Sequence, residues 1–121
     1  MSVRVYLPTT RAGLAALVTG DGWQERRVSE GAEPVIAAGD SEDEEYSALM
    51  TAADASTALY DVTGEPGRRR VVVVAEVASA DAPVTRDDVA SVHLDTEDRT
   101  PDADPDDDLA WFAPEELTHL L

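Results

Sequence analysis

Carboxylates and two histidines carry almost all the chemistry that this sequence offers. The chain has 26 Asp and Glu residues, His93 and His119, and neither cysteine nor lysine. This inventory excludes thiol nucleophiles, disulfides, cysteine metal ligands and Schiff-base lysines. Acid–base catalysis and cation binding by carboxylates remain. There is no G-x-G-x-x-G or Walker A pattern, so we expect no cofactor and assign no catalytic residue.

Four acids have the spacing closest to a metal site. Asp104, Asp106 and Asp108 alternate, and Glu115 stands at the twelfth position from Asp104. Ca²⁺ takes carboxylate oxygens from such positions in an EF-hand loop, which also needs glycine at its sixth position. Leu109 stands there instead. We therefore favour a solvated acidic linker, with a cation site as the alternative.

Glu76 and His93 are further candidates for acid–base chemistry. Glu76 is the acid within an apolar strand, and its pKa is expected to be raised if it faces the core. We expect it to face solvent, because burying an unpaired carboxylate is costly. His93 can act as a general base and should face away from Val92 and Leu94 on a strand. Without a partner nearby in sequence, we prefer a surface or hydrogen-bonded histidine.

Trp111 and Phe112 follow the acidic run and precede Pro114. Aromatic residues beside proline could dock a partner protein. Because the chain has one Phe and two Trp, we expect this pair instead to anchor the C-terminal helix to its own core. Docking is the alternative interpretation.

Hydrophobic spacing predicts the elements that position these residues. Residues 3–7 alternate as a strand that Pro8 ends, and Thr9 or Thr10 can cap a helix that ends at Gly20. Residues 24–29 and 34–38 could form a hairpin. A longer helix begins at Ser41, which forms a capping-box pattern with Glu44. Its apolar stripe is predicted to contain Tyr46, Leu49, Met50, Ala53, Thr57 and Tyr60.

The second half of the chain contains the central strand. The predicted elements are a turn at 63–67, a strand at 69–77 that is buried on both faces, a one-turn helix capped by Thr85, a strand through Leu94, an acidic loop at 95–108 and a short helix from Pro114. The order of elements resembles a split βαβ (ferredoxin-like) arrangement with a C-terminal extension. We expect a single α+β domain over residues 1–121, with a mixed sheet and two main helices on one face. The order or mobility of residues 95–108 stays open.

The charge of the chain limits its partners. A net charge of −17 disfavours nucleic acid, and the one arginine cluster, at 68–70, adjoins a strand. No apolar stretch of 18 residues predicts a membrane span. With no cysteine to report the redox compartment, cytoplasm is the default expectation.

Three segments resemble an uncharacterised actinobacterial family of unknown function. They are the R-V-Y-x-P start at 4–10, the acidic E-E-Y helix at 41–55, and the W-F-A-P-E-E-L end at 111–117. The resemblance implies a single cytoplasmic domain, and the family has no established catalytic residues to carry over to this sequence.

We therefore expect a non-catalytic interaction or regulatory module with a protein partner, or a homodimer formed through its sheet. The alternative is a carboxylate-based metal-binding protein or hydrolase. An enzyme should have a concave pocket where Glu76 or His93 meets other acids. A binding module should expose an apolar patch with acids at its rim.

Overall fold

Four antiparallel strands form the centre of the structure, a computed structural model that describes residues 2–19, 33–80, 82 and 84–120. The strands are β1 (Val3–Thr9), β2 (Val71–Val77), β3 (Val89–Leu94) and β4 (Ala110–Phe112), and they lie in the order β1-β2-β3-β4. The α+β class is confirmed. The prediction of a mixed, ferredoxin-like sheet is wrong, because every neighbouring pair of strands is antiparallel and the strands follow one another in chain order.

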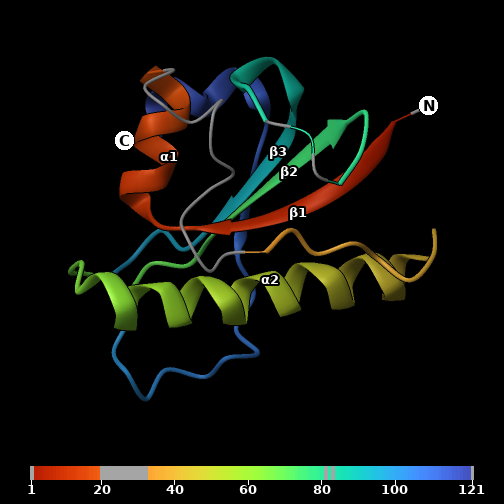
Figure 1. The fold of residues 1–121 in the computed structure, drawn as a ribbon. Helices are drawn as coiled ribbons and strands as arrows, with labels where there is room; N and C mark the ends of the chain where they lie inside the picture. Colours follow the sequence, from red (N-terminus) through yellow and green to blue (C-terminus); the bar gives the residue numbers. More distant parts are fainter. Residues whose placement is uncertain (1, 20–32, 81, 83, 121) are drawn as a thin grey trace.

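Helices cover both faces of the sheet, not one (Figure 1). Helix α1 (Arg11–Thr19) packs on one face with the 3₁₀ helices η1 (Arg86–Asp88) and η2 (Pro114–His119). Helix α2 (Glu42–Thr63) lies on the other. The C-terminal helix predicted from Pro114 is the 3₁₀ helix η2. Gly20, the predicted end of the first helix, and residues 24–29 of the predicted hairpin lie outside the described residues.

β2 is the central strand that its run of valines predicts. Because side chains alternate along a strand, Val71 and Val73 pack towards α1, whereas Val72 and Val74 pack towards α2. All four are buried.

Pro8 does not end β1, but lies within it opposite Val72. The backbone N–H and C=O of Tyr6, two residues earlier, point outwards and pair with Val35. Pro8 therefore has its missing N–H on the outer side of an edge strand, where a sheet tolerates proline. Val35 is also the one described residue of 34–38 that pairs like a strand, through this isolated bridge.

The α2 helix begins as predicted but buries a different stripe. Ser41 Oγ accepts from the N–H of Glu44 at 3.2 Å, and Gly64 ends the helix in the left-handed conformation. Its buried residues are Ala48, Ala52, Ala53, Ser56, Leu59 and Tyr60. These are mostly small, so the helix axis can lie close to the valine-rich sheet, while Tyr46 and Leu49 stay at the edge of the contact.

Candidate functional site

The acidic loop at 95–108 is built around a buried arginine. Arg70 is fully buried, and its guanidinium meets both carboxylate oxygens of Asp95, at 2.8 and 2.9 Å. It also donates to the carbonyl oxygens of Pro105 (3.1 Å) and Asp107 (2.8 Å). The loop is thus held at both ends by one side chain, although most of its residues are exposed. The prediction of a simple solvated loop is wrong at Asp95, which is buried.

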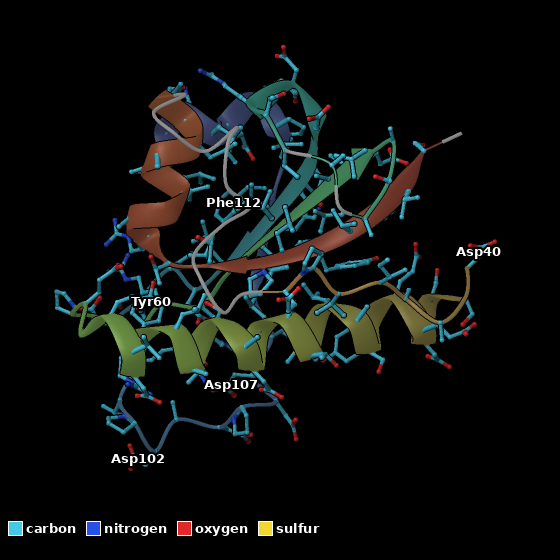
Figure 2. The ribbon with its side chains drawn as sticks, viewed as in Figure 1. Asp40, Tyr60, Asp102, Asp107 and Phe112 are labelled. Carbon is cyan, nitrogen blue, oxygen red and sulfur yellow. The ribbon has the colours of Figure 1, made fainter. Side chains whose placement is uncertain are left out.

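The other arginines near the loop are also paired. Arg99 donates to the Asp104 carbonyl at 2.8 Å and lies 3.3 Å from an Asp107 carboxylate oxygen. Arg68 and Arg69 pair with Asp61 and Asp98, at 2.6 and 2.8 Å. A hollow of about 600 Å³ lies inside the loop. The loop runs along α2, with Asp102 at its tip (Figure 2).

The four predicted metal ligands do not come together. No group of three or more His, Asp or Glu side chains could hold a metal ion within the part of the chain that the structure describes. Asp104 instead accepts from the Asp106 N–H at 2.9 Å, and Asp108 accepts from the Tyr46 hydroxyl at 3.0 Å. Glu115 stands on η2.

Glu76 faces solvent, as expected. It points to the α2 side of β2 and lies 3.8 Å from a guanidinium nitrogen of Arg4, both side chains being about half exposed. The same guanidinium lies 3.5 Å from Glu45 on α2. The positive charge of Arg4 therefore offsets part of the negative charge of Glu45 and Glu76.

The His93 side chain lines a hollow on the α2 side of the sheet. The register places it opposite Val72 on β2 and Trp111 on β4, and it faces away from Val92 and Leu94 as predicted. Its Nε2 lies 3.3 Å from Ser91 Oγ. Burial lowers the pKa of His93 below its ordinary 6.5, so the ring is neutral at pH 7.

We call this hollow of about 230 Å³ the aromatic groove. It is lined by side chains of the sheet and of the first turns of α2: Arg4, Tyr6, Glu45, Tyr46, Leu49, Val74, Ser91, His93 and Trp111. Three of the chain's six aromatic residues line it. Trp111 is 61% exposed and Tyr46 50% exposed.

The Trp-Phe pair is divided between the two faces of the sheet. Phe112 packs against the core on the α1 side, in the cluster that also contains Leu117 of η2. Trp111 does not anchor the C-terminal helix, because alternation along β4 turns it to the opposite face beside His93.

Acids surround the aromatic groove. The hydrogen bond to Asp108 raises the pKa of Tyr46, with further contributions from the charges of Asp108 and Asp106. Burial raises the pKa of Tyr6, and the charge of Glu45 adds to this. Negative charge therefore acts on Tyr46 at one end of the groove, whereas at Tyr6 the charge of Arg4 opposes that of Glu45.

Ser91 and His93 resemble the first two members of a hydrolytic triad. The third member, a carboxylate that orients the imidazole, is missing: no Asp or Glu of the described residues pairs with the His93 ring. Glu45, the acid that lines the groove, pairs with Arg4.

Comparison with known proteins identifies the family. A family model for a family of unknown function, DUF6912, matches residues 3–121. The chain belongs to this family. This confirms the resemblance to a family of unknown function. No curated protein and no solved structure matches this DUF6912 chain. Among its described residues, no helix is long and apolar enough to cross a membrane.

Tyr46, His93 and Trp111 can each be singled out in the sequence, but no sequence pattern places them together. Helical spacing predicts Tyr46 in the core stripe of its helix, and no motif marks Ser91. The signal that unites them is the β3–β4 register, which pairs His93 with Trp111.

Proposed function

We propose that this protein is a non-catalytic interaction module that binds a segment of a partner protein at the aromatic groove. The observation that carries the proposal is the exposure of Trp111 and Tyr46 beside one hollow. These large side chains are 61% and 50% exposed in a chain with only six aromatic residues. Exposed aromatic side chains around a concave surface are typical of the residues that dominate protein interfaces.

The sheet edge supports binding of an extended segment. β4 is a three-residue edge strand, and Trp111 is at its centre. The opposite edge, β1, is occupied in part by Val35 and carries Pro8. A partner strand can therefore pair with the outer edge of β4 while one of its side chains enters the groove.

The charge of the protein favours a basic partner over a second copy of the chain. Two copies that met at the aromatic groove would bring together Glu45, Asp106 and Asp108 from each, within proteins of net charge −17. A basic segment would instead gain from the same acids. We propose the cytoplasm as the compartment of this interaction, on the sequence grounds given above, and cell fractionation with an antibody tests it.

Selection from a displayed library of random peptides tests the proposal. The wild-type protein is the bait, and Trp111→Ala serves for counter-selection. We expect peptides that bind the wild type and lose roughly tenfold or more in affinity to Trp111→Ala or Tyr46→Ala, as for central interface aromatics. Both variants should keep the wild-type melting temperature to within a few degrees, because the two side chains are half exposed or more.

Val62→Ala is the matched control. Val62 is an 81% exposed apolar residue near the C-terminal end of α2 and does not line the groove. Its removal should leave peptide affinity unchanged. The proposal fails if every selected peptide binds Trp111→Ala and Tyr46→Ala as tightly as it binds the wild type.

A further inference from the structure

We infer that the side chain that enters the aromatic groove is an arginine of a basic partner segment. The inference rests on the proposed function and adds the chemistry of the group that is recognised. Three features of the groove favour an arginine: two exposed aromatic rings, an excess of carboxylates, and the position of Arg4 at the far end.

The aromatic rings suit a planar cation. Trp111 stands on β4, and Tyr46 is directed towards the same edge by its 3.0 Å hydrogen bond to Asp108, just before that strand. A guanidinium over the face of Trp or Tyr is attracted by the ring quadrupole and stacks as a flat group. The apolar part of an arginine side chain can lie against Leu49 and Val74, which also line the hollow.

Negative charge exceeds positive charge around the groove. Among the described residues, the carboxylates of Glu45, Glu76, Asp106 and Asp108 lie in or beside it, against the guanidinium of Arg4. The positive charge of Arg70 also acts on Tyr46, but that guanidinium is buried and paired with Asp95. His93 adds no charge at pH 7, because burial lowers its pKa. An anionic ligand would meet a repulsive surface, and a cation an attractive one.

Arg4 leaves the aromatic end of the groove open to a cation. It stands on β1, whereas Trp111 stands on β4, three strand spacings or about 14 Å across the sheet. Glu45 and Glu76 hold the Arg4 guanidinium at its own end, at 3.5 and 3.8 Å.

Asp108 can pair with the incoming guanidinium. Its Oδ1 accepts from the Tyr46 hydroxyl, and its Oδ2 accepts no hydrogen bond from the residues that the structure describes. The carboxylate therefore stands at the edge of the Tyr46 ring with an oxygen to spare. An arginine stacked on that ring can donate to this oxygen through its N–H groups, a geometry that a lysine ammonium does not reproduce.

Three peptides that differ at one position test the inference. They carry arginine, citrulline or lysine in the centre of the same Gly-Ser sequence, and citrulline is the neutral counterpart of arginine. Binding is followed by NMR through the Trp111 indole N–H, which is assigned with Trp111→Phe. We expect the arginine peptide to bind roughly two- to thirtyfold more tightly than the citrulline peptide. We expect the lysine peptide to bind less tightly than the arginine peptide.

Asp108→Asn should reduce the preference for arginine over citrulline. Asp87→Asn is the matched control: it removes the same charge from an exposed position on η1, which packs on the other face of the sheet, and should leave the preference intact. Citrulline or lysine binding as tightly as arginine would overturn the inference while leaving the groove a binding site. If none of the three peptides shifts the NMR signal of the Trp111 indole N–H but a selected displayed peptide does, the inference fails and the proposed function stands. If neither the displayed nor the designed peptides need Trp111, both proposals fail.

Discussion

The guanidinium of Arg70 and the carboxylate of Asp95 form a buried, two-pronged ion pair, with nitrogen–oxygen distances of 2.8 and 2.9 Å. The same carboxylate accepts from the backbone N–H of Arg70 at 2.9 Å. The remaining donors of the guanidinium reach the carbonyls of Pro105 and Asp107. A single side chain thus connects the start of β2 to both ends of the acidic loop, and the loop leads into β4 and Trp111.

Arg70→Met should therefore destabilise the protein strongly. Removing one partner of a buried ion pair costs about 3–5 kcal/mol, and we expect the lower value because Arg99 remains 3.5 Å from Asp95. Urea unfolding followed by circular dichroism measures the loss. The double variant Arg70→Met/Asp95→Asn should recover part of it, because no carboxylate is then left without its partner.

Arg69→Met is the control for this prediction. The Arg69–Asp98 pair lies one residue away, but the Asp98 side chain is 70% exposed. Its loss should cost about 0–1 kcal/mol. Equal costs for Arg69→Met and Arg70→Met would show that burial does not distinguish the two pairs.

The local elements could be predicted from the sequence, but their partners could not. The valine run marked a central strand, and Ser41 with Glu44 marked the start of α2. These signals are local, since each depends on residues a few positions apart. Strand order and register depend on contacts between distant segments. The mixed sheet was therefore predicted wrongly, although the strands themselves were found.

The aromatic groove and the buried arginine were hidden for related reasons. Alternation alone placed His93 on the face opposite Val92, but the β3–β4 register decides that Trp111 lies beside it. Arg68, Arg69 and Arg70 look equivalent in the sequence. They differ in what surrounds them, and Arg70 is the one that meets Asp95 in the core.

Ser56→Ala should cost about 1–3 kcal/mol, although the change removes a single oxygen atom. The buried hydroxyl of Ser56 donates to the Thr9 carbonyl at 2.7 Å and accepts from the Val71 N–H at 2.9 Å. The substitution leaves both backbone groups unpaired where β1 ends and β2 begins. Ser47→Ala, at an exposed position of the same helix, should change the free energy of unfolding by less than about 0.5 kcal/mol. Two equal effects in urea unfolding would contradict the bridging role of Ser56.

Ala52→Leu should destabilise the protein by about 1–3 kcal/mol, because Ala52 is fully buried between α2 and the sheet. The added carbons would push the helix away from Val72 and Val74. Ala58→Leu makes the same change at an exposed position of α2 and should be nearly neutral. Thermal melts of the two variants compare them directly. A neutral Ala52→Leu would mean that the helix does not pack closely at this position.

The stability of the protein should fall as His93 takes up a proton. Burial lowers the pKa of His93 in the folded state below 6.5, its value in the unfolded chain. Between these two pKa values the unfolded chain binds more protons than the folded one, so the free energy of unfolding rises with pH. The contribution of His93 is therefore fully present above pH 6.5 and is lost as the pH falls from 6.5 through the folded-state pKa. Urea unfolding across this range should show the decline in the wild type and in His119→Gln, which changes the other, exposed histidine. The His93→Gln variant should lack this pH-dependent component. In the wild type, an NMR titration of the His93 ring protons should give a pKa below 6.5. Parallel stability curves for the wild type and His93→Gln would contradict the prediction.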